Sequence, residues 1–257
     1  MTGHTLTLAG GVQMPILGLG TWQSHGDECY QAVRTALELG YRHVDTATMY
    51  RNEDQVGRAI RDAGVPREEL FVTTKLPPER VGRARATLTA SLQALGLEYL
   101  DLWLIHWPPH GDAGVDTWAE FVKARGDGLT RAVGVSNYSA PQIDRLTSAT
   151  GETPAVNQIP WSPWEYSSWV LDAHRERGVV VEGYSPFKRS RLRDKVLADV
   201  AAAHGVTPAQ VILRWHIEHD VVVIPKSVRP ERLAANLDVF GFSLTPDEVA
   251  RIDTLGR

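Results

Sequence analysis

The chain has 257 residues, with 27 lysines and arginines against 31 aspartates and glutamates, a net charge of −4 and 43% hydrophobic residues. This composition is typical of a globular protein and leaves no uniform basic field for nucleic acid. A single cysteine excludes an internal disulfide and thiolate zinc sites, and we expect no metal. No apolar run approaches the roughly 18 residues of a membrane helix, so we expect no membrane partner either.

The first predicted element is a β-hairpin over Thr5 to Met14, with its turn at Gly10 and Gly11. The preceding residues Met1 to His4 contain neither a cationic leader nor a long apolar stretch, and we therefore expect a cytoplasmic protein.

After the hairpin, short apolar strands alternate with amphipathic helices. The predicted strands are Ile16 to Leu19, His43 to Asp45, Leu70 to Lys75, Leu100 to His106, Ala132 to Val135, Ala155 to Gln158, Val179 to Tyr184 and Val221 to Pro225. The predicted helices cover residues 27–39, 53–63, 79–95, 116–126, 140–148, 167–177, 193–204 and 229–238, with additional helices over Pro208 to His219 and from Pro246 onward.

Eight strand–helix units predict a parallel α/β sheet covered by helices, and favour a closed (β/α)8 TIM barrel as one domain over residues 1–257. The main alternative is an open doubly wound sheet, which calls for a G-x-G-x-x-G turn after the first strand. The corresponding run Gly18-Leu19-Gly20-Thr21-Trp22-Gln23 lacks the third glycine and carries a bulky Trp22. The barrel is the better prediction.

Active-site residues of such barrels lie at the carboxyl ends of the strands. Three predicted strands end in Asp45, Lys75 and His106, and the loop after the second strand carries Tyr50. A tyrosine that donates protons near neutral pH needs a stabilised phenolate, because its ordinary pKa is about 10. We expect Lys75 to lower the pKa of Tyr50, and Asp45 to keep Lys75 charged and oriented.

In this arrangement His106 would hydrogen-bond the substrate oxygen. An acid aimed at an oxygen, without a nucleophile or a metal, suits reduction of a carbonyl group by an external hydride. Phosphosugar isomerases and binuclear-metal hydrolases fit less well, because the sixth predicted strand ends in Gln158 and the first carries Gly18-Leu19-Gly20 where paired histidines are needed.

Over nearly its whole length the chain resembles the aldo-keto reductase family. The resemblance is carried by four motifs in order: Gly40-Tyr41-Arg42-His43-Val44-Asp45-Thr46-Ala47 with Tyr50, Leu104-Ile105-His106-Trp107-Pro108, Val133-Gly134-Val135-Ser136-Asn137-Tyr138, and Ile224-Pro225-Lys226-Ser227 with Arg232 and Asn236. It implies a barrel that reduces aldehydes or ketones with NADPH, and a catalytic tetrad of Asp45, Tyr50, Lys75 and His106.

The same resemblance implies the cofactor contacts. Ser136, Asn137 and Gln158 would bind the nicotinamide carboxamide, and Tyr184 would stack on the ring. The remaining cofactor residues that it implies are Gly20, Thr21, Asp45, Ser185, Phe187, Lys226, Ser227, Arg232 and Asn236. A cation, a hydroxyl and a bidentate donor at the start of a helix suit the 2′-phosphate that distinguishes NADPH from NADH.

The loop from Pro109 to Val115 is short and the chain stops at Arg257 soon after its last helix. We therefore expect a shallow, open pocket walled by Trp22, Tyr50, His106 and Trp107, with broad specificity for hydrophobic or aromatic carbonyl compounds. Two other functions stay open: a cofactor-binding regulatory subunit with little turnover, and a noncatalytic structural barrel. We expect a monomer, since no exposed heptad seam calls for an oligomer.

Overall fold

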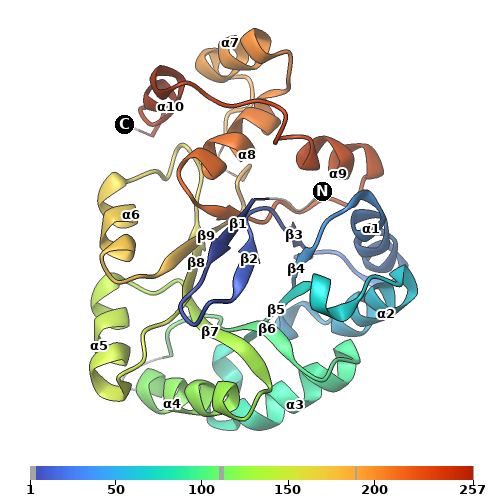
Figure 1. Cartoon of the computed structure of the whole chain (residues 1–257), viewed down its shortest axis with the longest axis vertical. Coiled ribbons are helices and arrows are strands. Elements are labelled where there is room, and N and C mark those ends of the chain that lie inside the picture. The colour runs from blue at the N-terminus through green and yellow to red at the C-terminus, as the bar shows by residue number, and fades with distance from the viewer. Residues whose placement is uncertain (1–3, 110–112, 189, 257) are drawn as a thin grey trace.

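The computed structural model describes residues 4–109, 113–188 and 190–256 (Figure 1). Its main sheet has eight parallel strands in the order β3-β4-β5-β6-β7-β8-β9-β10. Parallel bridges between Leu17 and Val223 and between Gly20 and Lys226 join the two edges, and helices surround the ring of strands. The predicted (β/α)8 barrel is thereby confirmed, and the open sheet is not the fold of this chain.

The eight strands lie within a few residues of their predicted positions. They are β3 (Leu19–Gly20), β4 (His43–Asp45), β5 (Phe71–Leu76), β6 (Leu100–Ile105), β7 (Thr130–Ser136), β8 (Val156–Pro160), β9 (Val180–Tyr184) and β10 (Val222–Val223). The helices are α1 (Gly26–Leu39), α2 (Glu53–Ala63), α3 (Ala84–Leu95), α4 (Ala113–Gly126), α5 (Ala140–Thr150), α6 (Ser168–Arg175), α7 (Lys195–His204), α8 (Pro208–Glu218), α9 (Pro230–Leu237) and α10 (Pro246–Ile252).

The predicted hairpin consists of β1 (Thr5–Thr7) and β2 (Gln13–Pro15), paired antiparallel. Gly10 and Gly11 have φ angles of 85° and 81°, a conformation that glycine adopts without a steric penalty. Met14 is fully buried and belongs to the same apolar cluster as Leu102 and Leu104 of β6. The hairpin therefore seals one end of the barrel.

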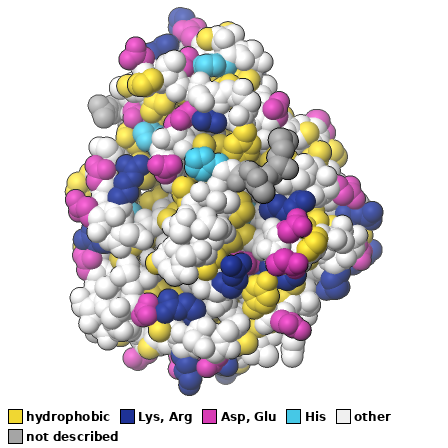
Figure 2. Space-filling model, in the orientation of Figure 1, with side chains coloured by type: hydrophobic (Ala, Val, Ile, Leu, Met, Phe, Trp, Pro, Cys, Tyr) yellow, Lys and Arg dark blue, Asp and Glu magenta, His cyan; other side chains and the backbone are white. Residues whose placement is uncertain are grey.

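Charges of both signs are interspersed over the face that Figure 2 shows.

Side chains alternate between the inside and the outside of the barrel along each strand. Val72 of β5 packs in the outer apolar layer, whereas its neighbour Thr73 contacts His43 of the adjacent strand β4 inside the barrel. By the same alternation Asp45, Lys75, Gln158 and Glu182 converge inside the barrel from four different strands. This polar layer of the interior is the candidate site.

Among the described residues, no single helix is both long enough and apolar enough to cross a membrane; α7 and α8 meet that test only as a pair, with an 88° bend between them.

Candidate active site

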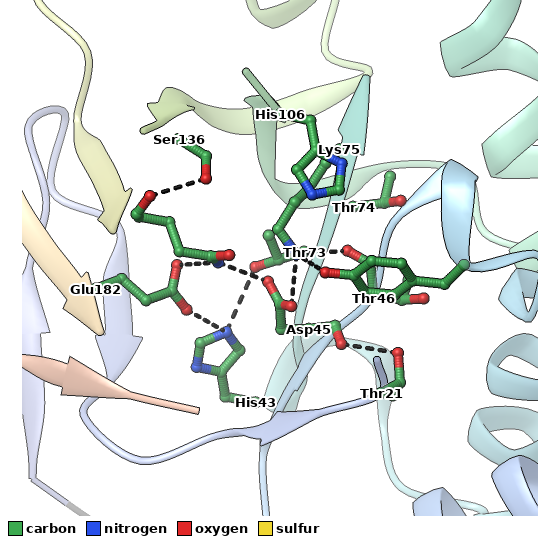
Figure 3. Close-up of polar contacts among 12 residues, drawn as sticks. Thr21, His43, Asp45, Thr46, Thr73, Thr74, Lys75, His106, Ser136 and Glu182 are labelled. Carbon is green, nitrogen blue, oxygen red and sulfur yellow. Dashed lines mark hydrogen bonds and ion pairs between the residues drawn. The ribbon is translucent and has the colours of Figure 1, made fainter. Parts of the chain in front are cut away.

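Lys75 is fully buried on β5, and its ammonium group has three oxygen acceptors. Lys75 Nζ lies 2.5 Å from Asp45 Oδ1, 2.9 Å from the Thr46 carbonyl oxygen and 3.5 Å from Tyr50 Oη (Figure 3). An ammonium group has three hydrogens to donate, so its donors match these acceptors in number. The structure thus brings together the predicted lysine, aspartate and tyrosine.

The ion pair keeps the lysine charged despite its burial. Burial alone lowers the pKa of Lys75, but Asp45 and Tyr50 more than offset this, and the pKa lies above its usual range. Burial also raises the pKa of Asp45, against the opposing effect of Lys75 and of a hydrogen bond from Gln158. At a separation of 2.5 Å we assign the pair as ammonium and carboxylate.

Tyr50 ends a short 3₁₀ turn, Thr48–Tyr50, that follows β4. Its ring centroid lies 4.8 Å from that of Trp22 and 5.8 Å from that of His106. Burial raises the pKa of Tyr50 above 10, although Lys75 lowers it. The expected net lowering is therefore not found in the chain alone: the ammonium acts in the predicted direction, but desolvation outweighs it. The hydroxyl stays protonated at neutral pH, as a proton donor must.

His106 follows β6 and lies above Lys75 (Figure 3). Burial, with a smaller effect of the Lys75 charge, lowers the pKa of His106 to about 3. Its Nδ1 atom is buried and has no hydrogen-bond partner among the described residues. The imidazole is consequently neutral, with one N–H to donate toward a ligand oxygen.

A residue outside the predicted set holds the two loops of the site together. Asn52 is fully buried, and its Nδ2 donates to the carbonyl oxygens of Thr21 and Ser24, both at 3.0 Å. Its Oδ1 accepts a 2.7 Å bond from Thr46 Oγ1. Asn52 thereby ties the loop after β3 to the loop after β4 and keeps Trp22 beside the tyrosine.

Of the predicted carboxamide-binding residues, Ser136 ends β7, Asn137 follows it and Gln158 lies in the middle of β8, while the predicted ring-stacking residue Tyr184 ends β9. Asn137, at a φ of 64°, donates through Nδ2 to the His106 carbonyl oxygen at 3.1 Å and to Ser136 Oγ at 3.0 Å. Its Oδ1 accepts a 2.8 Å bond from Tyr184 Oη. Both amide hydrogens of Asn137 are therefore used within the protein, and only its oxygen retains capacity for a ligand.

The side-chain amide of Gln158 also has both of its hydrogens bonded within the protein. Its Nε2 donates to Asp45 Oδ2 and to Glu182 Oε2, each at 2.8 Å. Its Oε1 accepts no hydrogen bond from the part of the chain that the structure describes. Together Asn137 and Gln158 present two carbonyl oxygens, which is the complement of the NH2 group of a carboxamide.

The predicted phosphate-binding residues surround the start of α9. Lys226 and Arg232 are exposed, and neither forms an ion pair with a described residue. Ser227 Oγ accepts a 3.2 Å bond from the backbone N–H of Arg229, which is a third exposed cation here and was not predicted. These residues fit an anion through their side chains, since the backbone N–H groups of Arg229, Arg232 and Leu233 already have acceptors within the chain.

The remaining predicted cofactor residues already have structural partners or positions in the core. A Cβ atom on Gly20 would come within 2.8 Å of the Ile224 carbonyl oxygen, so glycine allows the barrel to close. Thr21 Oγ1 donates to the Asp45 carbonyl oxygen at 3.0 Å. Phe187 is half-buried against the core, Ser185 has a φ of 56° directly after β9, and Asn236 is buried in α9. Their contact with a cofactor stays a prediction.

Two large aromatic side chains are exposed at this end of the barrel. Trp22 is 48% exposed and Trp107 is 45% exposed, although both are large apolar groups. Residues 110–112 of the predicted short loop lie outside the described residues.

Sequence reasoning missed Glu182 and His43, which lie beside Asp45 inside the barrel (Figure 3). Glu182 Oε1 is 3.5 Å from His43 Nε2, and both side chains are fully buried. The available signal was a glutamate in the otherwise apolar run Val179 to Tyr184.

Comparison with known proteins gives the family. The model of the Aldo/keto reductase family matches residues 16–257. Morphine 6-dehydrogenase of Pseudomonas putida is 44% identical over 97% of this chain and 90% of its own length. The 2,5-diketo-D-gluconic acid reductase B of a Corynebacterium species is 43% identical over 98% of this chain and 93% of its own length.

Among solved structures, the aldo-keto reductase of Bombyx mori in complex with NADP is 38% identical, with a TM-score of 0.94 over 98% of this chain and 92% of that one. The matched family model covers all eight barrel strands, and with them the motifs that carry Asp45, Tyr50, Lys75 and His106. The chain belongs to the aldo-keto reductase family.

Proposed function

We propose that this protein reduces aldehydes and ketones to alcohols, with Tyr50 as the proton donor. As an aldo-keto reductase it is an NADP-dependent oxidoreductase that acts on carbonyl groups. The observation that carries the assignment of the acid is the Lys75 ammonium group, 2.5 Å from Asp45 Oδ1 and 3.5 Å from Tyr50 Oη.

When bound, NADPH supplies a hydride to the carbonyl carbon. Tyr50 donates its hydroxyl proton to the carbonyl oxygen as negative charge develops there, and an alcohol and a phenolate result. Lys75 stabilises that phenolate: at 3.5 Å two unit charges attract by ~5 kcal/mol at an effective dielectric constant of about 20. This attraction offsets part of the burial effect that holds the pKa of Tyr50 above 10 in the chain alone.

His106 complements the tyrosine. As a neutral imidazole it hydrogen-bonds the carbonyl oxygen without competing as an acid, because its pKa of about 3 keeps it unprotonated at neutral pH. Two groups on one oxygen, one from the loop after β4 and one from the end of β6, orient the carbonyl group and polarise it.

The cofactor residues are proposed on the same basis. The oxygens of Asn137 and Gln158 would accept from the carboxamide NH2, and Tyr184 would pack on the nicotinamide ring. Lys226, Ser227 and Arg232 would hold the 2′-phosphate, and the absence of ion pairs at the two cations among the described residues supports this. Arg229 extends the same basic group.

We propose that the substrates are hydrophobic or aromatic carbonyl compounds of varied shape. The half-exposed rings of Trp22 and Trp107 support this, since an apolar ligand would remove them from water. The relatives named above are a morphine 6-dehydrogenase and a 2,5-diketo-D-gluconic acid reductase, so the names of related chains refer to chemically different substrates. The cytoplasmic location and the monomeric state stay predictions.

The direct test is the loss of NADPH absorbance when the purified protein meets a panel that includes an aromatic aldehyde, an aliphatic aldehyde and an aldose. We expect turnover with several of them, fastest with the aromatic aldehyde. Binding of NADPH without any turnover would contradict the proposal and favour a regulatory subunit. Turnover of one small polar sugar alone would contradict the substrate class.

A further inference from the structure

The amide group of Gln158 lies between two carboxyl groups. Its Nε2 atom is 2.8 Å from Asp45 Oδ2 and 2.8 Å from Glu182 Oε2, and these partners come from β4 and β9. A primary amide has two N–H donors, and both are taken up by these contacts. A flipped amide would instead set an oxygen against the ionised Asp45 carboxylate, so the orientation is determined by chemistry.

The consequence concerns the other end of the amide. With Nε2 held by two acceptors, Gln158 Oε1 is available as an acceptor and accepts nothing from the described residues. Without Glu182, one N–H of Gln158 would lose its partner, and Asp45 alone would hold the amide. A single hydrogen bond permits rotation about the terminal side-chain bond, for which the rotamer preference is weak.

The polar contacts of the Glu182 side chain with other described residues are those with Gln158 and His43. This side chain is fully buried inside the barrel on β9, and it forms no ion pair with a described lysine or arginine. Burial, assisted by the charge of Asp45, raises the pKa of Glu182 to about 8. An acid at this place costs stability that an apolar side chain would not. Glu182 Oε2 accepts the 2.8 Å hydrogen bond from Gln158 Nε2, and Glu182 Oε1 lies 3.5 Å from His43 Nε2.

We propose that Glu182 is a positioning residue for the cofactor: it locks the amide of Gln158 so that Oε1 faces the NH2 group of the nicotinamide carboxamide. The protonated carboxyl accepts from Gln158 through Oε2 and keeps its own proton on Oε1, beside the neutral His43. This role rests on the proposed function, since it requires the nicotinamide to lie against Gln158.

The test compares two cofactors that differ only in the group concerned. NADP⁺ carries the carboxamide, whereas its 3-acetylpyridine analogue has a methyl group in place of the NH2. Dissociation constants for both are measured by quenching of tryptophan fluorescence in the parent, Glu182→Met and Glu182→Gln. Methionine matches glutamate in shape but removes the acceptor, and glutamine retains an acceptor oxygen.

We expect Glu182→Met to weaken NADP⁺ binding about tenfold, which corresponds to ~1.4 kcal/mol or one net hydrogen bond. The analogue should lose less than about threefold, and Glu182→Gln should bind both cofactors nearly as the parent does. Thr73→Val is the matched control: it removes a hydroxyl that contacts His43 in the same layer but does not contact Gln158, and it should change neither constant. If the Met variant does not fold, Glu182→Thr, whose side chain is too short to reach Gln158, gives the same comparison.

Equal weakening of both cofactors by Glu182→Met, or none of either, would overturn the positioning role while leaving the proposed function intact. A parent protein that binds neither cofactor would overturn the proposed function, and this role with it.

Discussion

The choice between the two nicotinamide cofactors depends on single cations at the start of α9. Arg232 is exposed and has no ion-pair partner among the described residues, so its guanidinium group is available to a phosphate. Arg232→Ala should raise the Michaelis constant for NADPH by roughly 10-fold or more, since a hydrogen bond to a charged group contributes about 1.5–3 kcal/mol. The constant for NADH, which lacks the phosphate, should change little.

Steady-state kinetics with both cofactors check this prediction. Arg251→Ala is the control, because Arg251 is 50% exposed on α10 and is not part of the basic group around α9. Equal changes for NADPH and NADH in Arg232→Ala would remove the assignment.

The chemistry of single residues was predictable from the sequence where a residue stands at a strand end. Lys75 and His106 were expected to meet because the carboxyl ends of parallel strands form one rim. The amide of Gln158 was not expected between two carboxyl groups, since its partner Asp45 lies 113 positions away in the chain. Nor could the balance between burial and the Lys75 charge at Tyr50 be judged without the packing around the ring.

At the scale of the elements, α2 and α3 approach too closely for a side chain at Gly57. A Cβ atom there would lie 2.2 Å from the Leu95 carbonyl oxygen, which is backbone and cannot rotate away. Gly57→Ala should therefore lower the free energy of unfolding by about 1–3 kcal/mol. Gly126→Ala at the exposed end of α4 meets no atom within 4 Å and should be neutral or slightly stabilising.

Thermal unfolding of the two variants beside the parent makes the comparison. A Gly57→Ala protein as stable as the parent would show that the helices can separate without cost, contrary to the close packing described.

The strands and most helices were predictable because apolar periodicity is a local property. The start of α3 was less accurate: helix was expected from residue 79, but residues Pro78–Arg83 form 3₁₀ turns and the α-helix begins at Ala84. Two barrel strands, β3 and β10, are shorter than predicted. The edges of the sheet meet there through isolated bridges, Leu17 with Val223 and Gly20 with Lys226, and not through a continuous ladder. Such closure depends on the geometry of the whole ring.

At the scale of the whole molecule, buried neutral histidines make stability sensitive to acid. Burial lowers the pKa of His43 and of His106 to about 3 and that of His216 to about 4. Below their unfolded value of about 6.5 the unfolded chain binds protons at these sites and the native chain does not, so stability falls as the pH falls. Glu182 has the opposite effect. Its pKa is raised from 4.5 to about 8, so between these two pH values the native chain binds one proton that the unfolded chain does not.

Over these four groups alone the difference is about two protons, or roughly 2–3 kcal/mol of unfolding free energy lost per pH unit below 6.5. Burial also lowers the pKa of His174, which adds to the loss, and raises the pKa of Asp45 and of Glu53, which opposes it. Denaturant titrations at pH 7, 6 and 5 measure it. A free energy of unfolding that stays constant across this range would contradict the burial of neutral histidines.

The central claim is that the hydroxyl of Tyr50, supported by Lys75, delivers the proton. It is tested most directly by the turnover number of Tyr50→Phe with NADPH and an aromatic aldehyde, alongside the dissociation constant for NADPH. Loss of a positioned general acid should lower turnover by about 10²–10⁴-fold, with cofactor binding within about twofold of the parent. Turnover equal to that of the parent would contradict the claim.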